Sequence, residues 1–340
     1  MSKENSKWLN TNTLVGFTDE RGPAWHYRLE DQDEESNHYP EAIPVDDVIR
    51  RLFNFTVEDQ PFYIRIGDDF VEVPERKAMV RTDNHTVLGV HKEGYQGHDY
   101  EEWLLDNWGH ILSQSKGELG IGSAGLLRKG AQAWVSIERP DTIEIAAGVK
   151  FRPYLLGYSS FDGSLSTGYG DKITLVVCDN TLNAAIREQG NTYRLRHTRH
   201  SMLRIAEARE ALEIVFKLED TFKQEVNALL KLKVSDKKWE QFLDIIIPIP
   251  ELPEDKETTR GVTVANNKRD AINALYKNDE RVAPWTGTAF GVLQAFNTYQ
   301  HHNSQVRGGV PRIIRNMEGA VSGKYGKADK NVLDLLAQVK

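Results

Sequence analysis

The sequence predicts an α+β protein: a mostly antiparallel sheet platform with helices, followed by a helical C-terminal arm that includes one long amphipathic helix. Three observations support this prediction. Hairpin signals recur in the first half of the chain, few helical patterns lie between them, and apolar residues at helical spacing dominate after Asn191.

The first part of the chain changes from irregular to regular structure near residue 44. Residues 1–43 are polar and acidic with little periodicity, so we expect an irregular lead-in. Pro44 precedes a short predicted helix, and Asp99 is placed to cap a second one that runs through Ile111. Between these helices the sequence predicts two hairpins, which pair 62–66 with 70–73 and 79–81 with 87–90.

The middle of the chain predicts further strands. Residues 117–130 carry five glycines, and we expect a tight turn that leads into the strand containing Trp134. Four strands are predicted at 131–137, 142–145, 154–156 and 173–177. Between the last two, residues 157–168 are rich in hydroxyl groups and glycine, which is typical of a loop.

Helical patterns follow. After Asn191 the 3–4 spacing of apolar residues predicts an amphipathic helix of roughly 30 residues. Ser235 is placed to cap a helix ending near Ile247, before a proline-rich acidic linker near 248–260. Three more helices are expected at 262–276, 287–301 and 331–339. The expected units are therefore the lead-in 1–43, an α+β domain 44–190 and a helical region 191–340.

Composition restricts the class of protein. The 340 residues carry a net charge of −7 and a single cysteine, Cys178, which favours a reducing, cytoplasmic location. No apolar run is long enough to span a membrane, and the N-terminus lacks a signal peptide, so we expect no membrane partner. Residues 1–150 have 16 Lys and Arg against 27 Asp and Glu, whereas 151–340 have 27 against 23. A polyanion would therefore contact the second half.

A basic run stands out in that second half. The segment 193–204 holds four arginines and an aromatic residue, with no acid before Glu207. Arginine binds phosphate through two parallel hydrogen bonds, and an aromatic ring offers a surface on which a base stacks. We expect these residues to bind nucleic acid: Tyr193, Arg194, Arg196, Arg199 and Arg204. The alternative is a solvated face that pairs with the acidic first half, within one chain or across a homo-oligomer.

Known catalytic and metal motifs are not matched. The glycine-rich stretch lacks the spacing of a dinucleotide fingerprint and the Gly-Lys-Ser/Thr of a P-loop. His197 and His200 lack the glutamate of a His-Glu-x-x-His motif, and His301 and His302 are adjacent, so on a helix they diverge. We therefore expect no catalytic residues, no metal and no cofactor.

Several short segments resemble one family, a phage- and plasmid-borne group described as a phage/plasmid-like protein or domain of unknown function. The likeness spans roughly residues 45–338 and is carried by Ser160–Ser164, Val176–Ala185, Arg196–Arg199, Val80–Asp83, Gly287–Gly291 and Arg312–Gly319. The family-signature positions are Asp162, Gly163, Ser164, Cys178, Asn180 and Thr181. Asp179 departs from the pattern. The resemblance implies no activity, but it implies a mobile genetic element and hence DNA replication, recombination or interference with a host.

Three functional hypotheses follow. The first is a non-enzymatic phage or plasmid protein that binds or anneals single-stranded nucleic acid in replication or recombination, with single-stranded DNA as the candidate partner. The second is a protein-interaction module, an acidic inhibitor of a host factor, because an acidic surface can mimic DNA. The third is a cryptic metal-dependent enzyme that uses Asp162, Asp179 and His197.

Overall fold

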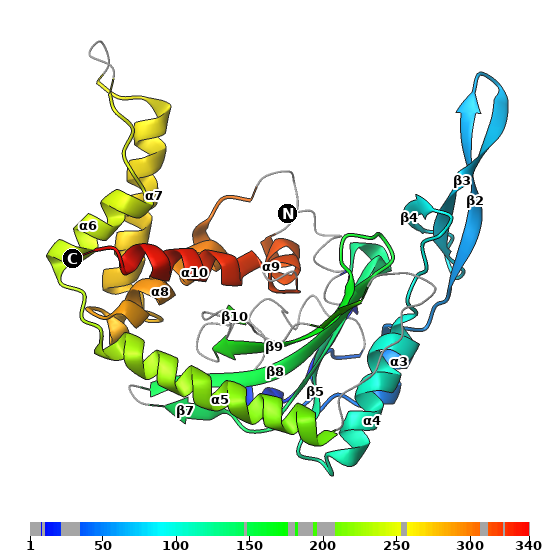
Figure 1. The fold of residues 1–340 in the computed structure, drawn as a ribbon, viewed down its shortest axis with the longest axis horizontal. Coiled ribbons are helices and arrows are strands. Elements are labelled where there is room, and N and C mark those ends of the chain that lie inside the picture. The colour runs from blue at the N-terminus through cyan, green and yellow to red at the C-terminus, as the bar shows by residue number, and fades with distance from the viewer. Residues whose placement is uncertain are drawn as a thin grey trace.

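The computed structural model describes residues 8, 11–21, 35–145, 148–175, 181–182, 193–195, 208–252, 257–306, 312–321 and 324–339. Their arrangement is α+β, as predicted: two antiparallel sheets with helices gathered in the C-terminal part. Figure 1 shows a curled central sheet between two projections, one a β-hairpin and the other helical.

The larger sheet forms the centre of the fold. Its strands pair in the order β1-β5-β6-β8-β9-β10, with β7 also on β8 and β11 also on β9, and these strand pairs are all antiparallel. The strands are β1 (Thr13–Val15), β5 (Gly120–Leu127), β6 (Gln132–Glu138), β7 (Ile143–Ile145), β8 (Val149–Ser160), β9 (Thr167–Leu175), β10 (Thr181–Leu182) and β11 (Tyr193–Leu195).

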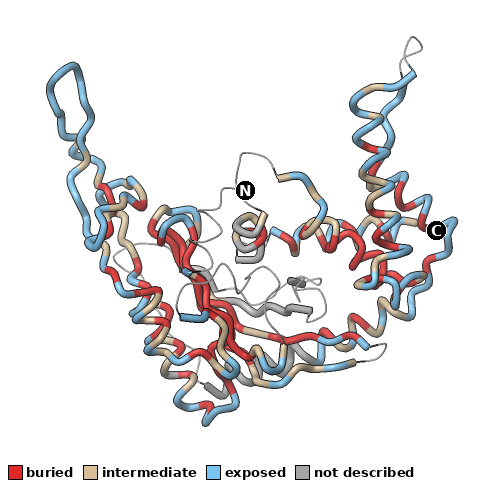
Figure 2. Tube along the Cα trace, turned by 180° about the vertical axis from the view of Figure 1, so that it is seen from behind, coloured by how far each residue is buried: buried red, intermediate tan, exposed pale blue. Residues whose placement is uncertain are grey.

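The smaller sheet contains both predicted hairpins. It consists of β2 (Val57–Ile66), β3 (Asp69–Arg81) and β4 (Val87–Lys92), so one long strand, β3, serves both hairpins. Gly67 has a φ of 64° in the first turn, a conformation that favours glycine. The base of this sheet is buried at Met79 and Leu88, whereas its outer part is exposed (Figure 2).

The helices begin where their capping residues predict. Asp99 Oδ1 accepts hydrogen bonds from the backbone N–H groups of Glu101 and Glu102, and Ser235 Oγ accepts one from Lys238. The helices are α2 (Thr18–Arg21), α3 (Val45–Arg51), α4 (Asn107–Gln114), α5 (Ala208–Lys231), α6 (Asp236–Ile246), α7 (Arg260–Asn278), α8 (Ala289–Thr298), α9 (Arg312–Val321) and α10 (Lys324–Leu336). A π-helical turn, Glu101–Asp106, precedes α4, and another, Tyr299–Asn303, extends α8.

Two large apolar clusters hold these elements together. One joins α3 and α4 to the central sheet through residues such as Leu52, Leu104 and Ile137. The other joins α5–α8 and α10 to the first residues of β8, where the rings of Phe151 and Phe222 lie 4.5 Å apart. Helix α5 contacts β8, β9, α4 and α8, so it links the sheet to the helical part.

The glycine-rich stretch was predicted to be a tight turn that leads into the Trp134 strand, and this is correct only for its end, where Arg128–Gly130 precede β6. Residues Gly120–Leu127 form β5, a buried strand in the middle of the sheet. The glycines leave room for the large side chains of the neighbouring strand, because a Cβ at Gly125 would lie 2.2 Å from Cη2 of Trp134.

Three further elements differ from the prediction. The expected loop 157–168 is shorter, because β8 continues through Ser160 and β9 begins at Thr167. The final helix begins at Lys324 rather than at Asn331. Helix α9 was not predicted, although Ile313, Ile314, Met317 and Val321 follow helical spacing. The described part of the long amphipathic helix, α5, has 24 residues.

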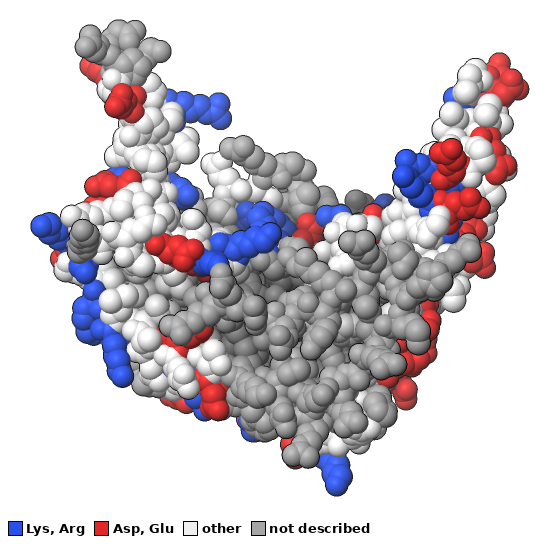
Figure 3. All heavy atoms as spheres, in the orientation of Figure 1, with Lys and Arg blue, Asp and Glu red and all other residues white. Residues whose placement is uncertain are grey.

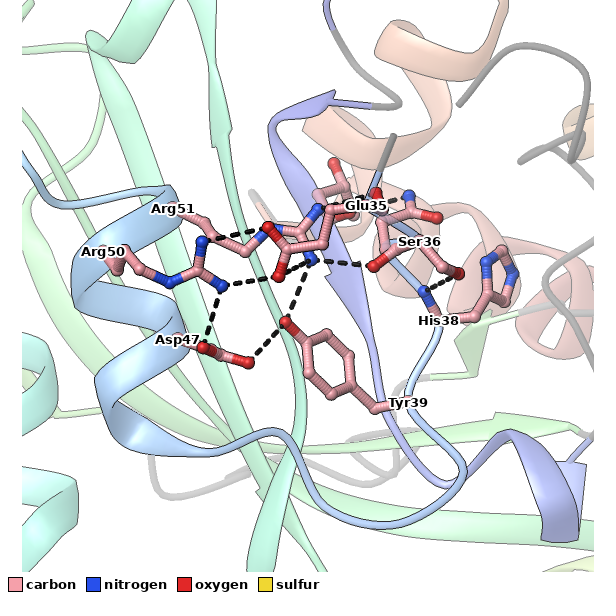
Figure 4. A network of polar contacts seen from close by, with 9 residues as sticks. Glu35, Ser36, His38, Tyr39, Asp47, Arg50 and Arg51 are labelled. Atoms are coloured by element: carbon pink, nitrogen blue, oxygen red, sulfur yellow. Dashed lines mark hydrogen bonds and ion pairs between the residues drawn. The ribbon is translucent and has the colours of Figure 1, made fainter. Parts of the chain in front are cut away.

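The lead-in is not wholly irregular either. Strand β1 pairs with β5, and Thr13 and Leu14 are buried. Residues 35–39 are then tied to α3 by the polar network in Figure 4. Arg50 donates to both carboxylate oxygens of Glu35, at 2.9 and 2.5 Å, and Arg51 donates to the carbonyl of Ser36 at 2.7 Å. The guanidinium of Arg50 holds the pKa of the Glu35 carboxyl below its usual range.

Candidate functional site at the turn between β8 and β9

The start of the basic run lies beside the turn between β8 and β9 of the central sheet. Strand β11 pairs with β9 so that Tyr193 is opposite Tyr169 and Leu195 is opposite Thr167. Because Thr167 is the first residue of β9, the basic run leaves the sheet at the end that carries the turn 161–166. The backbone at Tyr193 and Arg194 is therefore held by the sheet, whereas Arg196, Arg199 and Arg204 lie outside the described residues.

The family-signature residues of this turn stabilise it locally. Asp162 Oδ1 accepts hydrogen bonds from the backbone N–H of Ser164, at 2.9 Å, and from the Ser164 hydroxyl. Gly163 has a φ of 71°, which a residue with a side chain rarely adopts. These three residues therefore serve the turn geometry, as their composition indicates. Of the other signature positions, Thr181 begins β10 opposite Thr174, and Cys178 and Asn180 lie outside the described residues.

Two aromatic rings from the end of β4 hold the turn from one side. His91 Nε2 lies 2.7 Å from the carbonyl oxygen of Phe161, and the Tyr95 hydroxyl donates to the carbonyl of Ser160 at 2.9 Å. The two rings stack, with centroids 3.8 Å apart. Burial, together with the nearby negative charge of Asp162, raises the pKa of Tyr95 above its ordinary value. The turn is thus anchored to the end of the smaller sheet through two hydrogen bonds.

Arg128 holds the turn from the other side and connects three remote parts of the chain. Its Nη1 lies 2.9 Å from Oδ2 of Asp162, and its Nε lies 2.7 Å from Oε1 of Glu318 on α9. These carboxylates, Glu318 first, raise the pKa of the Arg128 guanidinium. The side chain is 45% exposed, so both ion pairs are screened and contribute little stability. Their main effect is to set the position of the turn relative to α9.

The backbone that carries Arg128 is strained. Arg128 and Lys129 have φ values of 52° and 60°, in the left-handed region, and Gly130 follows at 95°. Surrounding groups enforce this conformation, because Arg81 donates to the carbonyl of Lys129 and Tyr100 donates to that of Gly130, both at 3.0 Å. Strain of this kind in non-glycine residues is concentrated at functional sites. This backbone strain marks the end of the sheet that carries the β8–β9 turn, and the sequence analysis did not identify it.

Replacing Lys129 with glycine is expected to stabilise the protein by about 0.5–1 kcal/mol, because the left-handed conformation costs a lysine more than a glycine. Chemical denaturation of both proteins measures the difference. Lys116, which also has a positive φ (52°) in an exposed turn, provides a matched control when it is replaced with glycine. A loss of stability in the Lys129 variant alone would show that the lysine side chain stabilises this turn.

A buried hydroxyl–imidazole chain lies just inside the same end of the sheet. His98 Nδ1 is 2.6 Å from Oγ1 of Thr167, which is 2.7 Å from Oγ of Ser159. All three residues are at most 2% exposed, and the imidazole stacks on Trp103. A substrate cannot reach a hydroxyl buried to this extent, so the chain is better explained as internal support for β9. The sequence did not single out these residues.

The third hypothesis, a metal-dependent enzyme, names three residues, of which the structure describes only Asp162. Asp162 is held by Arg128 and Ser164, and Asp179 and His197 lie outside the described residues. Within the described part of the chain, three or more His, Cys, Asp or Glu side chains do not converge as a metal site would require. Likewise, none of the described helices is long and apolar enough to cross a membrane.

Comparison with known proteins gives a single match. Residues 87–320, which include the strained turn, the β8–β9 turn and Glu318, match the family model described as a domain of unknown function, DUF932. Neither a curated protein nor a solved structure matches the chain. Because the matched region covers more than half of its residues, the chain belongs to the DUF932 family.

Proposed function

We propose that this protein is a non-enzymatic component of a phage or plasmid that binds or anneals single-stranded DNA during replication or recombination. The observation that supports the proposal most directly is the pairing of β11 with β9. It fixes the first residues of the basic run to a rigid sheet, so the arginines that follow start from a defined position. A fixed starting point reduces the entropy lost when a basic segment binds.

The surroundings of that strand suit a polyanion at one end of the sheet. Lys129 is exposed at the strained turn, and Arg128 is partly exposed beside it. The second half of the chain also carries the excess of basic residues. Phosphate contacts from such residues bind single strands without reading their sequence. The proposal therefore includes tolerance of different DNA sequences.

The test is a titration of a labelled single-stranded oligonucleotide, followed by fluorescence anisotropy at several salt concentrations. We expect salt-sensitive binding by the unaltered protein. Replacing Arg194, Arg196, Arg199 and Arg204 with glutamine should weaken binding and lower the slope of log affinity against log salt by roughly 3, since each lost phosphate contact removes about 0.7 for a single strand.

A matched control removes the same amount of charge elsewhere. Lys92, Lys116, Lys150 and Lys277 are exposed and lie on other elements, so glutamine at these four positions should leave the slope nearly unchanged. Equal loss of binding in the two quadruple variants would indicate attraction by net charge alone. The absence of binding at low salt would refute the proposed function.

A further inference from the structure

Helices α9 and α10 and the residues just before them form a second basic segment, separate from the basic run that begins in β11. Between residues 305 and 330 the sequence has two acids, Glu318 and Asp329, and six bases: Arg307, Arg312, Arg315, Lys324, Lys327 and Lys330. Neither acid balances the segment at its surface, because Glu318 pairs with Arg128 and Asp329 is only 1% exposed. The segment therefore has an excess of positive charge that attracts a polyanion.

The two arginines that the structure describes in this segment are held by the protein itself. Arg315 Nη2 donates to the carbonyl of Gln300 at 2.7 Å, and Arg312 Nη1 lies 3.5 Å from the carbonyl oxygen of His301. Both carbonyls belong to the π-helical turn at the C-terminal end of α8, where the helix dipole is negative. Arg312 and Arg315 therefore stabilise the packing of α9 against that helix end.

The three lysines of α10 have no such partners. The buried face of α10 consists of Tyr325, Asp329, Val332 and Leu336. With 3.6 residues per turn, Lys324, Lys327 and Lys330 are centred on the opposite face, and all three are exposed. Within the described part of the chain, these lysines form no ion pair. We call them the lysine stripe.

The lysine stripe belongs to the same part of the molecule as the basic run. Helix α10 contacts β10, which pairs along the same edge of β9 as β11, where the basic run begins. Helix α9 contacts α10 and reaches the β8–β9 turn through the ion pair between Glu318 and Arg128. Figure 1 shows α9 and α10 between the helical projection and that turn, and Figure 3 shows Lys and Arg side chains gathered in the same place.

The pairing of the strands gives the scale of the separation. Leu182 of β10 is opposite Ile173, and Tyr193 of β11 is opposite Tyr169, so the two strands meet β9 four residues apart. At 3.3 Å per residue this separation is about 13 Å. A nucleic acid strand that rises 3.4 Å per nucleotide covers it with about four nucleotides.

We infer that the lysine stripe is a second contact surface for the single-stranded DNA that the basic run binds, an inference that rests on the function proposed above. One strand would contact the basic run, follow the edge of β9 and continue over α10. A lysine ammonium on its flexible stem binds phosphate as a point charge, which suits a strand whose sequence is not read. The stripe spans about 9 Å along the helix axis, enough for roughly three successive phosphates.

The test compares the salt dependence of binding in matched variants, with a labelled oligonucleotide of about 30 nucleotides that is long enough to cover both surfaces. The stripe variant carries Lys324→Gln, Lys327→Gln and Lys330→Gln. Its slope of log affinity against log salt should be lower by about 2, since three lost phosphate contacts remove about 0.7 each. All three positions are exposed, so circular dichroism and thermal unfolding should be unchanged.

A control variant removes the same charge from another exposed group. Lys231, Lys233 and Lys237 lie where α5 meets α6, away from β9, β10 and β11, and their replacement with glutamine should leave the slope nearly unchanged. A further variant combines the stripe substitutions with those of Arg194, Arg196, Arg199 and Arg204. If one strand contacts both surfaces, the two reductions add, and the slope should be lower by about 5.

The results separate this inference from the proposed function. If the variant of the basic run shows its reduced slope and the stripe variant binds like the unaltered protein, the inference is wrong and the proposed function stands. An equal reduction in the stripe variant and the control variant would also overturn the inference, because it would show attraction by net charge alone. The absence of binding by the unaltered protein at low salt would refute both.

Discussion

Replacing Arg152 with alanine is expected to lower the free energy of unfolding by about 3–5 kcal/mol, because it removes one of the two arginines that pair with the buried carboxylate of Glu138. Arg152 and Glu138 are each 2% exposed, and Nε of the arginine lies 3.2 Å from Oε2 of the glutamate. The guanidinium also donates to the carbonyls of Pro140 and Arg139, at 2.6 and 2.8 Å, and to the Thr142 hydroxyl at 3.1 Å. Burial lowers the pKa of the Arg152 guanidinium, and the negative charge of Glu138 opposes this shift.

The loss would affect three segments of the chain. Glu138 also pairs with Arg21 of α2, so the same carboxylate ties the N-terminal segment to β6 and β8. Urea denaturation of the Arg152→Ala variant measures the effect. Arg65, whose ion pair with Asp68 is exposed, is the matched control, and Arg65→Ala should cost less than about 1 kcal/mol. A similarly small loss in the Arg152 variant would show that water or a rearranged side chain replaces the guanidinium.

Replacing Asp329 with asparagine is expected to stabilise the protein at neutral pH by roughly 2–4 kcal/mol, with the gain disappearing in acid. Burial raises the pKa of the Asp329 carboxyl to about 8, against the opposing effect of the hydrogen bonds from the Asn297 amide. The folded protein therefore keeps this proton at pH values at which the unfolded chain has lost it. Between about pH 4 and pH 8, the free energy of unfolding should fall by about 1.4 kcal/mol per pH unit from this group.

Denaturation at several pH values tests this sign. The difference between Asp329→Asn and the unaltered protein should be near zero at pH 4 and largest at pH 8. Asp334 lies on the same helix and is exposed, so Asp334→Asn should show no comparable pH dependence. A constant difference across the whole range would mean that Asp329 does not take up a proton on folding.

Sequence patterns predicted the elements whose signals are local. Alternating apolar residues and turn formers located both hairpins of the smaller sheet, and the capping residues Asp99 and Ser235 marked the starts of their helices. The strand β5 was missed because its glycines are required by Trp134, which lies across the sheet rather than nearby in sequence. A local sequence pattern does not show which side chain will lie opposite on the neighbouring strand.

In the candidate site, too, the local features were predictable from sequence and the long-range contacts were not. Asp162, Gly163 and Ser164 were recognisable as a turn from composition. The contacts of Arg128 with Asp162 and of His91 with Phe161 join residues that are 34 and 70 positions apart, and only the folded chain brings them together. The strain at Lys129 is likewise imposed by Arg81, through a carbonyl hydrogen bond that sequence cannot predict.

The pairing of β1 with β5 has a consequence for protein synthesis. Thr13 lies opposite Gly125, so the ribosome makes the edge strand of the central sheet more than 100 residues before its neighbour. At about 5–20 residues per second, Thr13–Val15 wait roughly 6–20 s for that neighbour. During this interval the backbone groups of β1 that face β5 stay unpaired, whereas those that pair with Asn37 and Tyr39 gain their partners earlier. A chaperone that recognises short extended apolar segments has time to bind the open edge. Completion of the sheet would then release the chaperone at a defined stage of translation.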